Sequence, residues 1–130
     1  METPKDMKYA KTDEWIKLEG KVGTIGISDY AQEQLSDVVY VDIIPGVGDE
    51  AKKDTICATL ESVKAAADVN FPVSGKVIAV NDALSDTPEI VNSDPYGSAW
   101  MIKIELSNPA ELDSLMDADA YDAYCEEREH

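Results

Sequence analysis

The chain contains little of the residue types that build metal sites or disulfide frameworks. Its 130 residues include one histidine and two cysteines. Because Cys57 and Cys125 lie far apart and neither belongs to a C-x-x-C pair, the sequence predicts no zinc site and no disulfide network. Cys57 stands in an apolar run and is expected to be buried, whereas Cys125 is expected to be half exposed. Both cysteines are compatible with a reducing compartment.

Basic residues are also scarce. Lysine and arginine together number 11 against 27 aspartates and glutamates, which gives a formal net charge of -16. Such a charge repels phosphate backbones and anionic membrane surfaces, so we expect neither nucleic acid nor a membrane as a partner. It would attract a basic or mixed protein surface, and it would equally serve solubility alone. No apolar run reaches transmembrane length, and the N-terminus has no signal-peptide core.

The residue sets of a stand-alone enzyme are missing as well. The sequence has no Ser-His-Asp set, no phosphate-binding glycine loop and no cluster of metal ligands. The one histidine, His130, is the last residue and a poor catalytic candidate. We therefore expect a non-catalytic protein. With 44% hydrophobic residues, a chain of 130 residues suffices for one domain around a single core.

Several segments in the N-terminal third show the patterns of regular structure. Residues 1–7 are polar and are expected to be loosely held. Residues 15–18 and 21–27 flank a Glu-Gly turn, which predicts an N-terminal hairpin. Ser28 can cap a short helix that continues to residue 34 or 35.

Two further strands and a helical end complete this pattern. Residues 38–44 predict a buried strand, and residues 100–106 alternate in polarity as a half-buried strand does. From about residue 107 the character changes, because Pro109 follows Ser-Asn and starts one helix. A second helix opens near Asp117 and carries an apolar stripe of Tyr121, Tyr124 and Cys125. The chain is thus expected to be mainly β with short helices and a C-terminal helical extension at about 107–130.

One of the ten lysines stands apart from the others. The sequence Glu61-Ser62-Val63-Lys64-Ala65 lies between two strand-like segments, residues 55–60 and 73–80, and turn residues bound the unit. This order predicts Lys64 at the tip of a β-hairpin. A lysine held away from the body by a stiff support suits an enzyme that must grip one ammonium group and acylate it.

A short Pro-x-x-Gly motif occurs once before this lysine and once after it. Pro45-x-x-Gly48 opens the segment before Lys64, and Pro72-x-x-Gly75 opens the segment after it. Two similar β-units around one lysine predict a pseudo-symmetric sandwich with the lysine at its turn. Biotinyl and lipoyl carrier domains have this plan.

The lysine segment resembles the lipoyl-attachment hairpin of the glycine cleavage system H-protein family. The resemblance covers nearly the whole chain, because further blocks follow in the family's order and spacing. They are Lys8-Tyr9-Ala10, Glu14-Trp15, residues 22–32, residues 35–39, Pro72-Val73-Ser74-Gly75, Val91-Asn92, Asp94-Pro95-Tyr96-Gly97 and residues 100–104. The resemblance implies one domain over residues 1–130: a lipoyl/biotinyl-like β-sandwich of the hybrid-motif type with an added N-terminal hairpin and C-terminal helices.

The resemblance also implies a function. Lys64 would carry lipoate as an amide, and Glu61, Ser62, Val63 and Ala65 would shape the hairpin for a lipoate ligase or an octanoyl or lipoyl transferase. The arm would shuttle an aminomethyl group from the glycine decarboxylase (P protein) to the aminomethyltransferase (T protein), and dihydrolipoamide dehydrogenase (L protein) would reoxidise it. Such a protein is expected to be a monomer in the bacterial cytoplasm or, as a processed eukaryotic form, in the mitochondrial matrix.

A cleft for the loaded arm is a further implication of the resemblance. By position, Thr12, Glu14 and Asp68 match the residues that would hold an ammonium group there. Considered alone, Thr12 and Asp68 would be turn residues and Glu14 a surface acid. The family often has histidine where this chain has Asp13, which either strengthens attraction for a cation or is neutral surface variation. Glu61 is either a recognition acid or a strand end without a role.

Other functions remain open on the sequence alone. The chain would serve as a lipoyl relay or a carrier for another lipoate-dependent complex, or as an unmodified structural or regulatory β-domain. Two related carrier types fit less well. The lipoyl domain of a 2-oxoacid dehydrogenase usually has aspartate before the lysine, where this chain has Val63. A biotinyl domain has methionine on both sides, where this chain has Val63 and Ala65.

Overall fold

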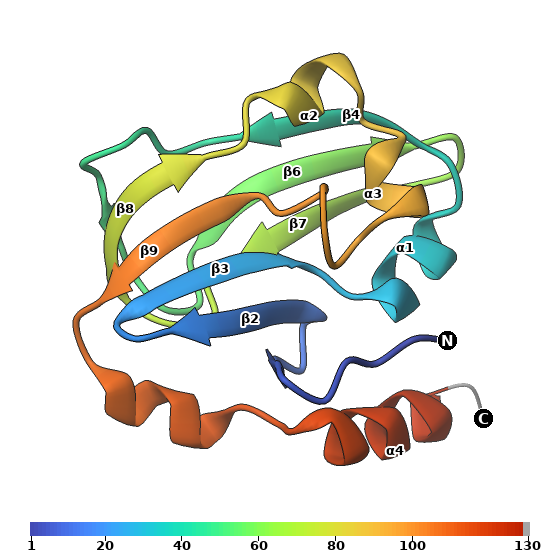
Figure 1. The fold of residues 1–130 in the computed structure, drawn as a ribbon. Coiled ribbons are helices and arrows are strands. Elements are labelled where there is room, and N and C mark those ends of the chain that lie inside the picture. Colours follow the sequence, from blue (N-terminus) through green and yellow to red (C-terminus); the bar gives the residue numbers. More distant parts are fainter. Residues whose placement is uncertain (129–130) are drawn as a thin grey trace.

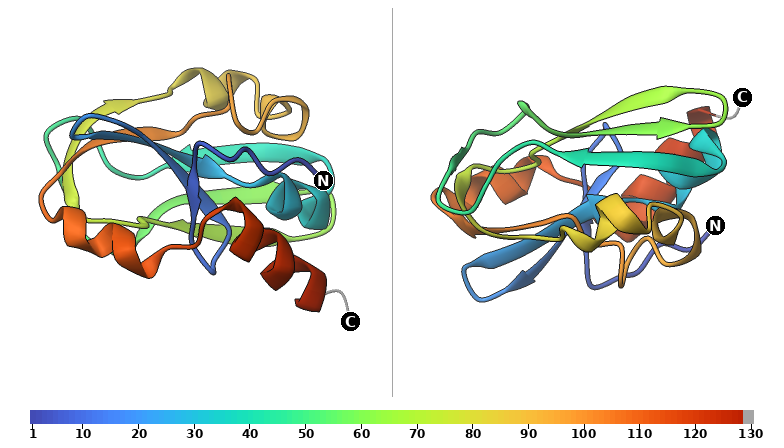
Figure 2. Two further views of the ribbon diagram at one scale, coloured as in Figure 1. Left: turned by 60° about the horizontal axis from the view of Figure 1, so that its bottom comes forward. Right: turned by 90° about the horizontal axis from the view of Figure 1, so that it is seen from above.

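The strands of the chain form two antiparallel sheets. A computed structural model describes residues 1–128, so His130 and the end of the expected C-terminal extension lie outside the described residues. The larger sheet has the strand order β1 (Lys8–Tyr9), β2 (Glu14–Glu19), β3 (Val22–Ile27), β9 (Ile102–Leu106), β8 (Gly75–Val80) and β5 (Glu50–Ala51). The smaller sheet has the order β4 (Val38–Ile43), β6 (Ile56–Ser62) and β7 (Ala66–Asn70). Figure 1 shows the elements, and the right-hand view of Figure 2 shows the two sheets as separate layers.

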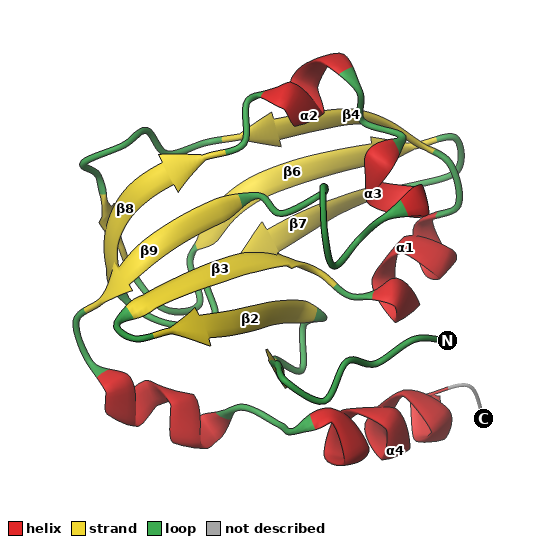
Figure 3. Cartoon of the chain, viewed as in Figure 1, coloured by secondary structure: helices red, strands yellow, loops and turns green. Residues whose placement is uncertain are grey.

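Short helices lie around the rim of this sandwich (Figure 3). They are α1 (Asp29–Leu35), α2 (Ala83–Asp86), α3 (Ile90–Ser93), the 3-10 helix η1 (Pro109–Ser114) and α4 (Ala118–Arg128). The expected fold class, mainly β with short helices in a lipoyl-type sandwich, is therefore confirmed. The two-sheet sandwich, the added N-terminal hairpin and the C-terminal helices are present as the family resemblance implies.

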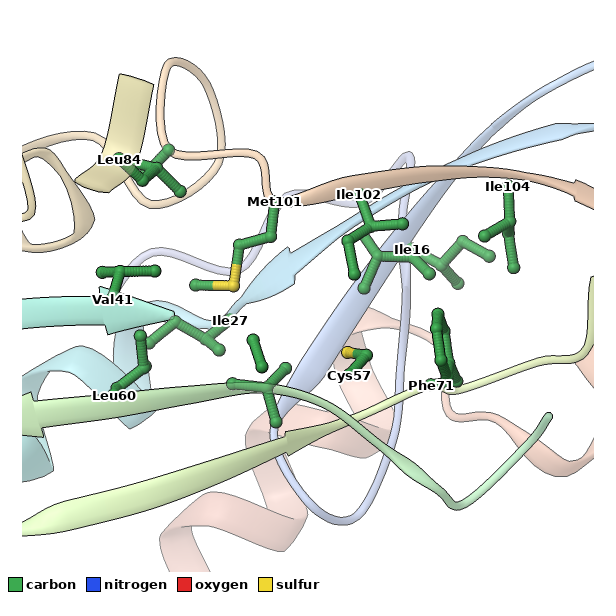
Figure 4. Close-up of a cluster of buried hydrophobic side chains, with 14 of the residues drawn as sticks. Ile16, Ile27, Val41, Cys57, Leu60, Phe71, Leu84, Met101, Ile102 and Ile104 are labelled. Atoms are coloured by element: carbon green, nitrogen blue, oxygen red, sulfur yellow. The ribbon is translucent and has the colours of Figure 1, made fainter. Parts of the chain in front are cut away.

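The main core fills the space between the two sheets (Figure 4). Side chains of both sheets point into it, at alternate positions except where β-bulges shift the register of β4 and β6. The larger sheet contributes Ile16, Ile25, Ile102 and Ile104, and the smaller sheet contributes Val41, Cys57, Leu60 and Val69, each no more than 1% exposed. Burial of one such aliphatic side chain contributes about 1.5–3 kcal/mol, so this layer supplies most of the stabilisation.

A second, aromatic cluster joins the N-terminal segment to α4. The rings of Tyr9 and Tyr121 stack with centroids 4.7 Å apart, and Met7 and Cys125 are buried in the same cluster. Two expectations are wrong here. Residues 1–7 are not loosely attached, because Met7 packs under the helix, and Cys125 is 2% exposed rather than half exposed.

The hairpin and the helix expected near the N-terminus are confirmed. Strands β2 and β3 pair along their full length around the Glu-Gly turn. The hydroxyl of Ser28 caps α1 by accepting a hydrogen bond from the Ala31 N–H at 3.2 Å. Strand β9 and helix α4 also form where the sequence places them, with Ile102, Ile104 and Tyr121 buried.

The strands around Lys64 differ from the expectation in two ways. The strand that returns from the lysine is β7, and residues 75–80 instead form β8 of the larger sheet, between β9 and β5. Strand β4 is only half buried, because it is an edge strand of the smaller sheet that buries Val38 and Val41 but exposes Val39 and Tyr40. The hairpin that carries Lys64 therefore lies entirely within the smaller sheet.

Candidate functional site

Lys64 stands in the turn between β6 and β7, as predicted. The Ser62 N–H donates to the Ala65 carbonyl at 2.8 Å. The Ser62 hydroxyl accepts from the Ala65 N–H at 3.0 Å and from the Lys64 N–H at 3.3 Å. No residue of this turn is a glycine or has a positive φ. A serine side chain thus closes the turn in place of the glycine that tight hairpins often use.

A second contact fixes the direction of the turn. The Val63 N–H donates to the Asp37 carbonyl at 3.0 Å, which ties the turn to the segment between α1 and β4. The side chains of Val63 and Lys64 are both exposed, and Lys64 enters none of the ion pairs found within residues 1–128. Figure 1 shows the turn at the same end of the molecule as α1. The backbone is therefore held while the ammonium group stays accessible.

A pocket of about 160 Å³ opens beside this hairpin. It brings together all three residues that the sequence predicts for a cleft, namely Thr12, Glu14 and Asp68. These come from the turn before β2, from the start of β2 and from β7. Apolar side chains complete the walls: Ile27, Leu35, Leu60 and Val69.

Glu14 is the buried acid of this pocket, with 1% of its surface exposed. Its carboxylate accepts hydrogen bonds from the Thr12 hydroxyl and, at 3.0 Å, from the Asn70 N–H. Burial raises the pKa of Glu14 from its ordinary value of 4.5 to about 7, although both hydrogen bonds act to lower it. The alternative of a surface acid is therefore wrong. At neutral pH the pocket holds a carboxyl that gains or loses its charge readily.

Asp68 lies on the exposed side of β7, opposite Thr59 of β6. It is a strand residue, so the alternative of a turn residue is wrong for Asp68, whereas Thr12 does stand in a turn. Strand β7 begins two residues after Lys64, and Asp68 is its third residue. The hairpin therefore joins the exposed lysine to the pocket by one rigid element.

Sequence reasoning missed Arg128, which lines the mouth of the pocket. It forms an ion pair there with Asp13, which the sequence did single out, and Arg128 Nη1 lies 2.6 Å from Asp13 Oδ1. The guanidinium also lies over the rings of Tyr30 and Tyr124, at 4.3 Å and 4.8 Å from their centroids. The available signal was that Arg128 is the one arginine in the chain. Its partner lies 115 positions away, which no local pattern reveals.

Two further observations limit what the site can do. Within residues 1–128, no group of three His, Cys, Asp or Glu side chains is arranged to hold a metal ion. No helix in this part of the chain is long and apolar enough to cross a membrane. What the site offers is an accessible lysine and a pocket lined by carboxylates.

A two-layer β-sandwich that presents one exposed lysine on a hairpin, with an acidic pocket beside it, defines a lipoyl-type carrier domain. The family model described as "Glycine cleavage H-protein" matches residues 7–128. The chain therefore belongs to the glycine cleavage H-protein family, the lipoyl carrier of the glycine cleavage system. Members of this family are carrier components of that system rather than catalysts.

Similar proteins come from distant organisms. A glycine cleavage system H protein of Symbiobacterium thermophilum is 52% identical over 124 residues, covering 95% of this chain and 96% of that protein. One of Thermotoga maritima is 53% identical over 118 residues, covering 91% and 94%. A mitochondrial one of Flaveria pringlei is 52% identical over 123 residues, covering 95% and 75%. The crystal structure of a glycine cleavage system H protein from Mycobacterium marinum superposes with a TM-score of 0.83 at 31% identity, covering 92% of this chain and 96% of that one.

Proposed function

We propose that Lys64 is the lysine to which lipoate is joined as an amide. The main observation behind this proposal is the structure of the turn, in which the Ser62 side chain holds the backbone while the Lys64 side chain stays exposed. Family membership supports the modification, since the family is a lipoyl carrier. When bound, the lipoyl group supplies a dithiolane that opens and closes by thiol–disulfide exchange. Glu61, Ser62, Val63 and Ala65 shape the turn that the acylating enzyme must enter.

The pocket is the part of the chain that shelters the carried group. The group would be an aminomethyl unit taken from the glycine decarboxylase and delivered to the aminomethyltransferase, with dihydrolipoamide dehydrogenase reoxidising the arm. Thr12, Glu14 and Asp68 are suited to an ammonium group, because a hydroxyl and two carboxyls accept its N–H bonds. A cation that enters the pocket favours the ionised form of Glu14. The apolar walls exclude water from the same space.

The remaining details follow from the same proposal. Residues 1–130 act as one carrier domain with a C-terminal helical extension at about 107–130, which the match over residues 7–128 supports. The protein acts as a monomer, and a lipoate ligase or an octanoyl or lipoyl transferase modifies it. Its compartment is the bacterial cytoplasm or the mitochondrial matrix, because relatives of both kinds exist.

Intact mass after incubation with a lipoate ligase, ATP and lipoate tests the attachment site. The wild-type chain is expected to gain about 188 Da, which is lipoic acid less water, and peptide mapping should place it on Lys64. Lys64→Arg should gain nothing, because arginine cannot form the amide, and should melt like the wild type. Lys53→Arg is the matched control, since Lys53 also stands in a turn, and it should be modified normally. No gain, or a gain on another lysine, would contradict the proposal.

A second assay tests the role in glycine cleavage. The lipoylated chain, mixed with glycine decarboxylase, aminomethyltransferase and tetrahydrofolate as the acceptor of the methylene carbon, should support one turnover that releases carbon dioxide and ammonia from glycine and leaves the arm as a dithiol. A chain that is modified on Lys64 but inactive here would instead be a lipoyl relay or a carrier for another lipoate-dependent complex. The two assays together separate the attachment site from the pathway that uses it.

A further inference from the structure

An exposed apolar patch lies on the edge of the smaller sheet, next to the hairpin turn. It consists of Val39 and Tyr40 of β4 and Val63 of the turn, which are 55%, 50% and 66% exposed. Large apolar side chains that gather on a surface commonly mark an interaction site. Strand β4 has β6 on one side and no strand on the other side within residues 1–128.

A β-bulge produces this exposure. The register between β4 and β6 shifts between Val38 and Tyr40, so Val39 is an extra residue without a partner of its own. Regular alternation would turn one of two successive residues inward, but here both Val39 and Tyr40 face solvent between the buried Val38 and Val41. Bulges at sheet edges often redirect side chains beside functional sites.

The patch is continuous with the turn that carries Lys64. Val38 pairs with Ser62 and Tyr40 pairs with Glu61, so the bulged residues lie beside the last residues of β6. Figure 1 shows the start of β4 at the same end of the molecule as the turn between β6 and β7. Val63 thus precedes Lys64 in the turn, and Val39 and Tyr40 lie on the strand that pairs with the residues leading into it.

Carboxylates surround these apolar residues. Three of them are exposed: Asp37, Asp42 and Glu61. Asp37 comes just before β4, Asp42 lies further along β4, and Glu61 of β6 pairs with Tyr40. An apolar centre with an acidic rim fits a partner surface that is apolar at its centre and basic at its rim. The net charge of -16 would speed the approach of such a partner.

We propose that Val39, Tyr40 and Val63 form the docking surface for the enzyme that acylates Lys64. This inference rests on the proposed function. The chain has ten lysines, and before modification the Lys64 side chain is chemically identical to the other nine. Several of those nine are also exposed. An acylating enzyme must therefore recognise the protein surface around the lysine, whereas enzymes that act later have the arm itself to bind. Among the exposed large apolar side chains of residues 1–128, Val39, Tyr40 and Val63 belong to the turn or to the strand that pairs with its base.

The rate of acylation tests the docking surface. A purified lipoate ligase with ATP and lipoate is used, and the gain of about 188 Da is followed over time at low and at saturating carrier concentration. Val39→Ser/Tyr40→Ser is expected to lower kcat/KM about tenfold or more with little change in kcat, because it removes docking contacts and leaves Lys64 in place. Val47→Ser is the matched control, since Val47 is 66% exposed beyond the far end of β4, and it should keep the wild-type rate.

Each other outcome has a distinct meaning. Acylation of the double variant at the wild-type rate, or an equal loss in Val47→Ser, overturns the docking surface while the attachment site stands. A wild-type chain that is never acylated on Lys64 overturns the proposed function and this inference with it. If sedimentation shows a concentration-dependent dimer that only the double variant loses, with acylation unchanged, the patch binds a second copy of the chain and the inference is wrong. Thermal melting of all variants confirms that they fold.

The acidic rim gives an independent test. The wild-type kcat/KM should fall as salt is raised, because screening weakens attraction between the rim and a basic partner. Asp37→Asn/Glu61→Gln should lower kcat/KM at low salt and flatten its salt dependence. A salt dependence equal to that of the wild type would show that these carboxylates do not meet the enzyme.

Discussion

Arg128 binds the carboxylate of Asp13 through both ends of its guanidinium group, with Nη1–Oδ1 and Nη2–Oδ2 distances of 2.6 Å and 2.9 Å. The Tyr121 hydroxyl donates to the same carboxylate at 2.7 Å. Asp13 therefore does not present an uncompensated charge to the pocket, although it stands where the family often has histidine. The Asp13–Arg128 ion pair connects the last turn of α4 to the turn that precedes β2, at the mouth of the pocket.

Arg128→Gln is expected to lower the free energy of unfolding by about 1–2 kcal/mol. The pair is bidentate and only partly exposed, with side-chain exposures of 30% and 16%, so it should contribute more than a typical surface pair. Urea denaturation of Arg128→Gln, Asp13→Asn and the double variant would give the coupling energy. If the losses of the two single variants add up to the loss of the double variant, the coupling energy is zero and the ion pair contributes nothing. Lys53→Gln, which breaks the exposed pair with Asp54, should change stability by less than about 0.5 kcal/mol.

Glu14 should make the protein less stable as the pH rises from about 4.5 to 7. Over this range the unfolded chain loses the proton of this carboxyl while the folded chain keeps it, because burial raises the folded pKa to about 7. The stability that the group retains below pH 4.5 is therefore lost through this window, by an amount on the order of 3 kcal/mol.

Glu14→Gln isolates this effect, since its amide is neutral at every pH and its carbonyl still accepts from the Asn70 N–H. The stability of the variant relative to the wild type should rise with pH between 4.5 and 7 in urea denaturation. In the wild type, the Asn70 amide resonance should titrate with a midpoint near 7, because that N–H donates to Glu14. A stability difference that is flat with pH would contradict the raised pKa.

The fold was largely predictable because most strands of this chain follow clear local patterns. Alternating side chains predict β2, β3 and β9, and Ser28 predicts the start of α1. Strand β7 was missed because Ala66-Ala67-Asp68-Val69-Asn70 contains few β-forming residues. It is a strand because β6 offers it a full ladder of partners from the turn onward. Tertiary pairing here overrides local preference.

The site was predictable only where its residues stand close in sequence. Lys64 and its turn are one segment, and a resemblance to a known family added Thr12, Glu14 and Asp68. The burial of Glu14 could not be predicted, because it depends on β7 and α1 closing over the start of β2. The Asp13–Arg128 pair joins positions 115 residues apart, so its existence depends on the packing of α4 against the aromatic cluster.

Gly75→Ala is expected to destabilise the chain severely, by more than about 3 kcal/mol. A Cβ at this position would lie 2.1 Å from the backbone oxygen of Glu105, so the pairing of β8 with β9 would have to shift. Gly46→Ala is the matched control. Its Cβ would meet nothing nearer than the Asp49 carboxylate at 3.9 Å, and its φ is not positive, so its stability should change by less than about 1 kcal/mol. Thermal melting of both variants would test this, and a stable Gly75→Ala would contradict the close approach.

The two cysteines should differ in how their thiols become reactive, although both are buried and neither is disulfide-bonded. Burial raises the pKa of the Cys57 thiol to about 12 and also raises the pKa of Cys125. Alkylation at pH 8 therefore requires an opening of the structure. Cys57 lies between the sheets and needs global unfolding, whereas Cys125 needs only the detachment of α4.

Iodoacetamide labelling followed by peptide mass mapping would measure both rates in the native protein. Cys125 should be labelled faster than Cys57, and addition of urea should bring the two rates together. Arg128→Gln should speed the labelling of Cys125 more than that of Cys57, because it releases α4 from Asp13 and leaves the sheets intact. Equal acceleration of both thiols would mean that the ion pair stabilises the whole fold rather than the attachment of this helix, and that α4 unfolds only together with the sandwich.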